Sequence, residues 1–270
     1  GAVAFHYGPA LTTEQRDFFG RFDVLVTHEP LPLTQVAELH RRGTKLALYE
    51  WAVAFYASRR TQWDERATLL NQRPLHGGVG DADADAFYYD PAAREHASGR
   101  SRAIAERLRI IGYDGIFLDT TTAGSVHPDA LGEYNRRHPD LAYDDAFAQF
   151  LRALRAELPL ILTNQGYRDA AHYLPYVDYD VTESLIVTRG RLRDFQELDA
   201  LMQSTILPAA RAYPHVRFIH LNYADDASDA AIVPAIAIAR MYGQEAFVGL
   251  HDVRRTAIHA AYFAGKHALP

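Results

Sequence analysis

The chain has 270 residues, of which 23% are charged and 48% hydrophobic, and its formal net charge is −6. This composition is that of an ordinary globular protein, and the acidic balance disfavours a nucleic-acid partner, because binding to a phosphate backbone requires clustered Lys and Arg. The sequence has no cysteine, which excludes disulfides, thiolate metal sites and a thiol nucleophile.

Short apolar runs alternate with longer amphipathic segments along the whole chain. The runs that predict strands are Val3–Tyr7, Phe22–Thr27, Lys45–Tyr49, Ile116–Asp119, Leu160–Asn164, Val177–Glu183, Val216–Asn222 and Ala246–His251. The segments that predict helices are Thr12–Phe19, Leu33–Arg42, Ala92–Ile111, Asp144–Glu157, Leu192–Ala212, Ser228–Tyr242 and Arg255–Phe263. A strand followed by a helix, repeated many times, is typical of parallel strands joined by crossovers.

Eight strand and helix units in a chain of this length predict an α/β fold, a closed (β/α)8 TIM barrel. An open doubly wound sheet is the alternative, but it usually carries a glycine-rich phosphate turn after its first strand, and no such motif occurs here. No linker or repeat divides the sequence, so we predict a single domain over residues 1–270. The longest irregular stretch is expected at Asn71–Asp90, and the longest apolar stretch, which contains Pro234, is too short to insert into a membrane.

The carboxyl ends of the predicted strands carry many polar and aromatic side chains. Barrel enzymes place their chemistry at these ends, and carboxylates, amides and aromatic rings together suit a sugar, whose hydroxyls need hydrogen bonds and whose C–H faces stack on rings. The candidate substrate contacts are Tyr7, Tyr49, Glu50, Asp90, Asn164, Tyr167, Asn222 and Asp252.

Two carboxylates at strand ends, Asp119 and Glu183, fit the requirement of glycoside hydrolysis best. The reaction needs one carboxyl group to protonate the leaving oxygen and a second to act as nucleophile or base. In a barrel, the ends of the fourth and sixth strands lie on one rim with a single strand between them. The sequence leaves open whether the separation is that of a retaining or an inverting enzyme.

Each of these residues also has a purely structural interpretation. Asp119 can be the N-cap of a following helix, Glu50 and Asp90 are as compatible with ion pairs as with substrate contacts, and Glu29 and Asp252 fit solvated loops better. Most of the 16 tyrosines are expected in the core. The 13 histidines show no H-x-H or H-E-x-x-H spacing, so neither a metal nor a cofactor is expected, and no G-x-S-x-G elbow is present.

The segment GYDGIFLDT, residues 112–120, resembles the fourth-strand signature of the endo-α-1,4-polygalactosaminidase-type glycoside hydrolases. These are TIM-barrel enzymes related to the hydrolase domain of the Pel polysaccharide protein. FYYDP at residues 87–91, LTNQGY at residues 162–167 and DVTESL at residues 180–185 also resemble segments of that family. By position, the resemblance implies that Asp119 is the nucleophile, Glu183 the acid/base, and Asn164 and Asp90 sugar contacts.

One segment departs from the family pattern. The third strand of the family usually ends with serine and glycine before a glutamate, whereas this chain reads LYEWAV, with Glu50 directly after Tyr49. The resemblance implies hydrolysis of polymers of α-1,4-linked galactosamine or N-acetylgalactosamine, such as the exopolysaccharide galactosaminogalactan. A partly deacetylated polymer is cationic, and the carboxylates of Glu29, Glu50, Asp90, Asp119, Glu183 and Asp252 are expected to attract it.

The expected mechanism is acid/base-assisted cleavage in which Asp119 stays ionised and the pKa of Glu183 is raised by burial or by the neighbouring charge. The expected partner is a polysaccharide or oligosaccharide, bound by a monomer in an extracytoplasmic compartment, secreted or periplasmic. Three alternatives remain at this point: a glycan-binding barrel without catalysis, a hydrolase of another polysaccharide, and a metal-dependent hydrolase.

Overall fold

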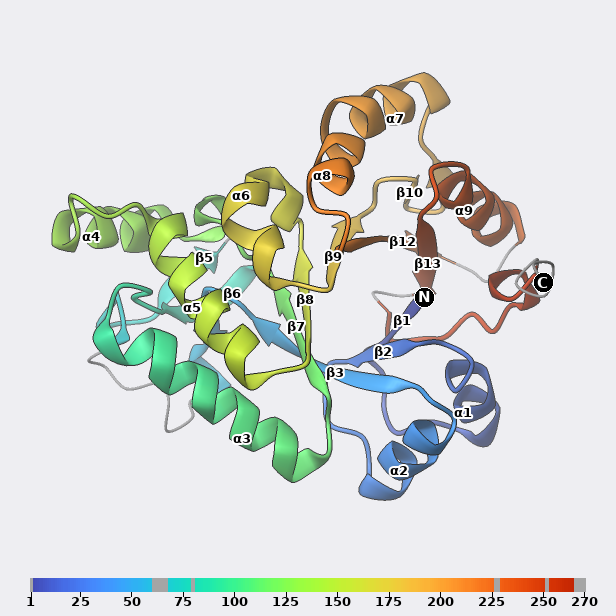
Figure 1. Ribbon diagram of the computed structural model, residues 1–270, viewed down its shortest axis with the longest axis horizontal. Coiled ribbons are helices and arrows are strands. Elements are labelled where there is room, and N and C mark those ends of the chain that lie inside the picture. Colours follow the sequence, from blue (N-terminus) through green and yellow to red (C-terminus); the bar gives the residue numbers. More distant parts are fainter. Residues whose placement is uncertain (1, 60–67, 79–80, 226–228, 251–252, 265–270) are drawn as a thin grey trace. The chain divides into compact units, whose positions relative to one another are not determined.

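The computed structural model describes residues 2–59, 68–78, 81–225, 229–250 and 253–264. One eight-stranded sheet has the order β1-β2-β3-β7-β8-β9-β12-β13, and Figure 1 labels these strands. Their bounds are β1 Val3–His6, β2 Val24–Thr27, β3 Lys45–Trp51, β7 Gly115–Asp119, β8 Leu160–Asn164, β9 Tyr179–Glu183, β12 Arg217–Ala224 and β13 Glu245–Leu250.

All eight predicted strands are therefore present, and the described pairings between them are parallel, as in β1 with β2, β7 with β8 and β12 with β13. The last strand lies beside the first, because the Phe5 and Phe247 rings are 5.9 Å apart and the Tyr7 N–H, just after β1, donates to the Val253 carbonyl. The sheet thus returns to its first strand, which confirms the (β/α)8 barrel.

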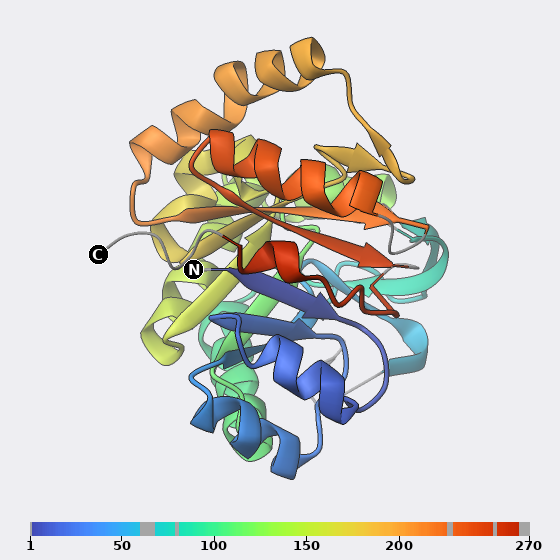
Figure 2. The same ribbon diagram turned by 90° about the vertical axis from the view of Figure 1, so that its right-hand side faces the viewer.

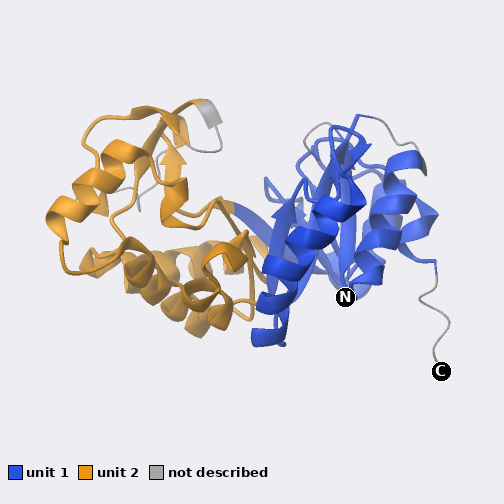
Figure 3. Cartoon of the chain, turned by 90° about the horizontal axis from the view of Figure 1, so that it is seen from above, with its two compact units in different colours: residues 1–49, 179–270 blue, residues 50–178 orange. Residues whose placement is uncertain are grey.

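Contacts group the chain into two compact units, shown in Figure 3. Unit 1 comprises residues 1–49 and 179–270, and unit 2 comprises residues 50–178. The prediction of a single domain over residues 1–270 stays a prediction.

In unit 1 the helices are α1 Thr13–Phe19, α2 Leu33–Arg41, α7 Phe195–Leu201, α8 Leu207–Ala212 and α9 Asp229–Met241. Thr12 and Gln15 form a capping box at α1, which explains why this short helix begins where the sequence predicts. The single helix predicted over Leu192–Ala212 begins instead after Asp194, whose side chain caps it, and a π-helical turn at Met202–Ile206 joins α7 to α8. Figure 2 shows α9 lying across β12 and β13.

The helix predicted over Arg255–Phe263 is wrong. Arg255 instead pairs with Leu250 in a β-bridge, and only a 3-10 turn at Ala260–Tyr262 follows. The Tyr262 and Phe263 rings pack edge-on against Phe22, with ring centres 5.5 and 5.2 Å away. Burial of these aromatic rings favours an extended chain over a helix here.

In unit 2 the helices are α3 Ser101–Ile111, α4 Pro128–Arg137, α5 Tyr143–Glu157 and α6 Ala170–Tyr173. The helix expected from Ala92 begins two residues later, at Arg94, and runs through a π-helical turn at His96–Arg100 into α3. The sequence reading missed α4 because few of its residues are apolar, and only Ala130 and Tyr134 are buried.

The prediction of an irregular stretch at Asn71–Asp90 is also wrong, because two strands lie in it. Strands β4 Ala54–Tyr56, β5 Leu75–Gly78 and β6 Asp81–Tyr88 form an antiparallel sheet in the order β4-β6-β5. In β6, Asp83 and Asp85 are exposed while Ala84 and Ala86 are buried. This alternation with period two is the pattern of a half-buried strand, although Asp has a low strand propensity. Unit 1 also contains an antiparallel hairpin that was not predicted, formed by β10 Val187–Thr188 and β11 Arg191–Leu192.

Acid pH is expected to destabilise unit 1 through His220, which is fully buried on β12. Its Nε2 lies 2.5 Å from the Gln244 side-chain oxygen and its Nδ1 lies 2.6 Å from the Thr182 hydroxyl. Burial lowers the pKa of His220 to about 4. As the pH falls from about 6.5 to 4, the unfolded chain binds this proton and the folded chain does not, so about 3 kcal/mol of unfolding free energy is lost.

Denaturant unfolding measured across this pH range tests the prediction. His220→Gln, which removes the titrating group, should give a flatter pH dependence than the wild type. His215→Gln changes an exposed histidine and is the control. Equal slopes for the wild type and His220→Gln would contradict the assignment.

Candidate active site

The turn before β7 requires both glycines of the GYDG segment. Gly112 ends α3 in the left-handed conformation, with φ 73°, which glycine adopts without strain. A Cβ at Gly115 would lie 2.1 Å from the Leu160 carbonyl oxygen, so only glycine permits the close pairing of β7 with β8. The strand that follows is buried from Gly115 to Leu118 and ends at the half-buried Asp119.

A side-chain amide and a main-chain N–H both donate to the Asp119 carboxylate. Asn164 Nδ2, at the end of β8, lies 2.6 Å from Asp119 Oδ1, and the Thr120 main-chain N–H lies 2.9 Å from the same oxygen. No helix begins at Asp119, because the next element is a 3-10 turn at Ala123–Ser125 with Thr122 at its N-cap position. The N-cap interpretation of Asp119 is therefore wrong, and the structure brings two predicted site residues, Asp119 and Asn164, into direct contact.

Thr121 connects the loop after β7 to the end of β8 and to α6. Thr121 Oγ1 donates to the Asn164 carbonyl at 3.0 Å, and the Tyr173 hydroxyl donates to the Thr121 carbonyl at 2.7 Å. The same tyrosine is hydrogen-bonded to Asp144, and burial raises its pKa far above the ordinary value. Tyr173 thus stays protonated and holds the loop as a permanent donor.

Glu183 ends β9 and is half-buried. The Tyr223 hydroxyl, on the neighbouring strand β12, donates to Glu183 Oε1 at 2.5 Å. The predicted substrate contact on β12 was the adjacent Asn222, but this side chain is fully buried. Its oxygen accepts from the main-chain N–H groups of Ile186 and Val187, and its amide donates to the His220 carbonyl. Asn222 thus shapes the loop after Glu183, and Tyr223 is the residue that contacts the carboxylate.

The residue after each of these three strand ends has a left-handed backbone without being glycine. The φ angles are 50° at Thr120, 59° at Gln165 and 53° at Ser184. Each such conformation costs on the order of 1–2 kcal/mol for a residue with a Cβ, and strain of this kind clusters at functional sites. Of the five described positive-φ residues other than glycine, three therefore follow Asp119, Asn164 and Glu183.

Half-buried aromatic rings lie at the ends of the first three strands in unit 1. The Tyr7 ring centre is 5.4 Å from that of His28 and 5.6 Å from that of Tyr49, and His28 and Tyr49 are 4.6 Å apart. Glu29 approaches His28 to 3.3 Å. The predicted candidates Tyr7 and Tyr49 thus share one cluster with His28, which the sequence analysis did not select.

Two predicted substrate contacts are engaged by protein cations instead. Glu50 is hydrogen-bonded to Arg107 and lies 3.5 Å from Arg100. Asp90 is buried, and its Oδ2 lies 3.0 Å from His138 Nε2 and 3.5 Å from Arg137. These contacts favour a structural role for both carboxylates over the predicted contact with a sugar.

Of the two other predicted substrate contacts, Tyr167 is described by the structure and Asp252 is not. Tyr167 is half-buried in the 3-10 turn Gly166–Asp169, which follows β8, and Asp252 lies outside the described residues. Within the described ranges, no group of three or more His, Asp or Glu side chains is arranged to hold a metal ion. No described helix is both long and apolar enough to cross a membrane.

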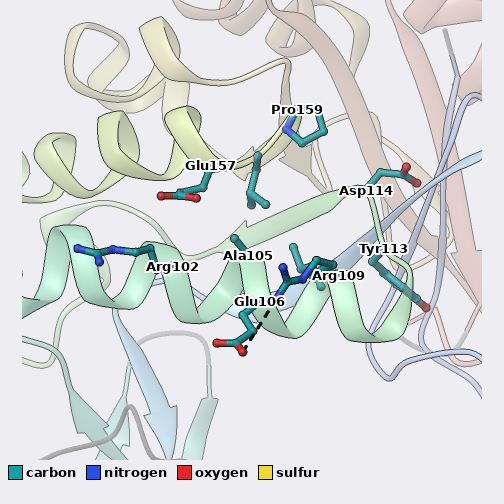
Figure 4. A pocket seen from close by; sticks show the side chains of 10 residues that line it. Arg102, Ala105, Glu106, Arg109, Tyr113, Asp114, Glu157 and Pro159 are labelled. Carbon is teal, nitrogen blue, oxygen red and sulfur yellow. Dashed lines mark ion pairs between the residues drawn. The ribbon is translucent and has the colours of Figure 1, made fainter.

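A hollow of about 600 Å³ lies in unit 2 between α3 and the end of α5. Figure 4 shows Arg109 and Glu106 of α3 on one side and Glu157 and Pro159 on the other. Tyr113 and Asp114, also in its lining, precede β7, so this hollow lies at the opposite end of that strand from Asp119.

Tyr223→Phe should lower kcat by about 10- to 100-fold, because a hydrogen bond to a charged group is worth ~1.5–3 kcal/mol. The loss should appear in kcat more than in KM, because the hydroxyl contacts the candidate carboxylate and not the sugar. Tyr242→Phe removes a hydroxyl that donates to Asp199 at 2.8 Å and is the matched control. A kcat for Tyr223→Phe equal to that of the wild type would contradict the role of this contact.

Solved structures of carbohydrate-active enzymes share the architecture of this chain. The glycoside hydrolase domain of PelA from Pseudomonas aeruginosa has a TM-score of 0.68 at 20% identity, covering 94% of this chain and 96% of that one. Ega3 from Aspergillus fumigatus, in complex with galactosamine, has a TM-score of 0.58 at 14% identity, covering 93% and 91%. The sequence matches no protein-family model and no curated protein. These structural matches agree with the family resemblance of the GYDGIFLDT segment and confirm the fold that it implied.

Proposed function

We propose that this chain is a glycoside hydrolase in which Asp119 is the nucleophile and Glu183 the general acid and base. The observation that carries the proposal is the construction of the two strand ends. Each ends in a half-buried carboxylate that accepts a hydrogen bond from a side chain of the neighbouring strand and precedes a left-handed residue. The structural likeness to the PelA hydrolase domain and Ega3 supports the same reaction class.

In the proposed reaction, Glu183 donates its proton to the glycosidic oxygen while Asp119 attacks the anomeric carbon through an oxocarbenium-like transition state. Glu183 then takes a proton from the water that releases the sugar. Asn164 and the Thr120 N–H fix the orientation of the Asp119 carboxylate. The Tyr7, His28 and Tyr49 rings offer apolar faces on which the C–H side of a sugar can stack.

The proposed substrate is an exopolysaccharide of α-1,4-linked galactosamine and N-acetylgalactosamine. Because such a polymer lies outside the cell, we propose that the enzyme acts outside the cytoplasm. Support comes from the GYDGIFLDT segment and from the galactosamine in the Ega3 complex. The attraction expected for a cationic polymer is weaker than the sequence suggested, because Glu50 is paired with Arg100 and Arg107, and Asp90 with Arg137.

Reducing-end release by the wild-type protein tests the substrate. The panel should contain fully acetylated and partly deacetylated α-1,4-galactosaminan and one unrelated α-glucan, each with and without a chelator. We expect release from the galactosaminans, unaffected by the chelator and faster on the deacetylated polymer at low salt. Release from the glucan alone would reject the substrate, and loss of activity with the chelator would reject the two-carboxylate mechanism. Tight binding without release would identify a glycan-binding barrel.

A further inference from the structure

Arg100 is an enclosed cation in unit 2, in the π-helical turn before α3. Its side chain is only 2% exposed. The guanidinium carbon lies 3.8 Å from the centre of the Tyr89 ring and 4.9 Å from that of Phe150. Burying a charge is costly unless it is paired and hydrogen-bonded, so the partners of this side chain show what it stabilises.

Arg100 binds three consecutive residues at the end of β3. Nη1 donates to the Ala52 carbonyl at 2.6 Å, and Nη2 donates to the Trp51 carbonyl at 3.2 Å and lies 3.5 Å from Glu50 Oε1. The planar guanidinium can serve three acceptors at once, whereas a lysine ammonium is a point charge on a flexible stem. Glu50 is thus the counter-ion of Arg100, and Arg100 in turn binds the carbonyls of the two residues that follow Glu50 at the end of β3.

His96 lies four residues before Arg100 and supports the same arrangement. Its Nε2 is 3.2 Å from Arg100 Nη1, and its ring is buried. Burial and the charge of Arg100 lower the pKa of His96 well below its ordinary value. The imidazole is therefore neutral, and its Nε2 can accept a hydrogen bond from the guanidinium.

The strand end held by Arg100 is bonded to the main chain of Asp119. The Ala52 N–H donates to the Asp119 carbonyl at 2.9 Å, so one residue accepts from Arg100 and donates to Asp119. Arg137, also in unit 2, likewise donates to two carbonyls, those of Leu69 and Leu70. Arg100 differs in that the segment it holds binds the residue with the candidate carboxylate.

We infer that Arg100 is a positioning residue for Asp119, acting through the Trp51 and Ala52 carbonyls and the Ala52 N–H. The inference rests on the proposed function for its effect on turnover, but its structural step can be measured without any substrate. Removal of the guanidinium should loosen the Ala52 to Asp119 bond and misorient the carboxylate. Substrate affinity should change little, because Arg100 is proposed to act on Asp119 and not on the sugar.

The test compares Arg100→Met and Arg100→Lys with Arg155→Met. Arg155 Nη1 donates to Asp178 at 2.7 Å, near the first residues of β8 and β9. Arg155→Met therefore removes an ion pair from the same unit, but at the opposite ends of the strands from Asp119. Hydrogen exchange of the Ala52 amide and steady-state kinetics on the galactosaminan are measured for each folded variant. Arg100→Lys keeps the charge and serves if Arg100→Met does not fold.

We expect exchange of the Ala52 amide to rise at least tenfold in both Arg100 variants, with kcat falling about tenfold and KM staying within about twofold. Arg155→Met should leave the Ala52 amide and kcat unchanged. Wild-type exchange at Ala52 in a folded Arg100 variant overturns the inference, as does a rise in KM with kcat unchanged. If the wild type cleaves no substrate, the proposed function fails, and the exchange data still decide whether Arg100 holds Ala52.

Discussion

Asp119→Asn is expected to lower kcat on the galactosaminan by about 10³-fold or more, because the amide can neither attack the anomeric carbon nor stabilise its developing positive charge. The substitution keeps the side-chain oxygen that accepts from Asn164 and Thr120, so the fold should be retained. Circular dichroism and thermal unfolding check the fold, and initial rates of reducing-end release check the activity. A variant that keeps more than about one tenth of the wild-type rate would exclude Asp119 as the nucleophile.

Glu183→Gln separates the second role from the first. The general acid is needed only where the leaving oxygen must be protonated, so this variant should lose the polymer reaction but retain formation of the glycosyl intermediate from an aryl α-galactosaminide with an acidic phenol. Asp119→Asn should lose both reactions. The reverse pattern, with the aryl substrate cleaved by Asp119→Asn and not by Glu183→Gln, would exchange the two assignments.

Asn164→Ala is expected to lower kcat by about 10- to 100-fold. The lost hydrogen bond, 2.6 Å long, is made to a charged group and is worth ~1.5–3 kcal/mol. Without it, the Thr120 N–H still donates to Asp119 Oδ1, but the side-chain donor from β8 is lost. Steady-state kinetics should show the loss in kcat more than in KM, because an interaction with the nucleophile is used in the transition state.

Asn71→Ala is the matched control for Asn164→Ala. Among the described residues, Asn71 bonds main-chain groups of unit 2, namely the Tyr88 N–H and the carbonyls of Arg73 and Ala86. Its removal should lower stability and leave kcat unchanged. Equal losses of kcat in the two variants would mean that Asn164 acts through stability rather than through Asp119.

The sequence predicts the barrel because its eight strands are short, largely apolar runs that alternate with amphipathic segments and need no distant partner to be recognised. Asp119 was selected because it is the first charge after an apolar run, and Glu183 because it is the carboxylate that ends the predicted strand Val177–Glu183. The small sheet of β4, β5 and β6 was missed because β6 alternates Asp with Ala, and Asp has a low strand propensity that masks the period-two pattern. The final helix was expected from local composition, whereas aromatic packing on Phe22 decides the conformation.

The roles of the other candidates depend on partners that are distant in the sequence. Glu50 is paired with Arg107, 57 residues away, and Asp90 with His138, 48 residues away, so no local pattern distinguishes these carboxylates from substrate contacts. Tyr223 and Asn222 are neighbours on β12, and only the pleat of the strand decides which side chain reaches Glu183. The left-handed residues after three strand ends carry no sequence signal, because Thr, Gln and Ser are not typical of that conformation.

The most direct test of the two-carboxylate account is reducing-end release from partly deacetylated α-1,4-galactosaminan in the presence of a chelator, measured side by side for the wild type, Asp119→Asn and Glu183→Gln. The account predicts release by the wild type and loss of release in both variants, each folded as well as the wild type. Release that persists in either folded variant, or that the chelator abolishes in the wild type, would contradict it.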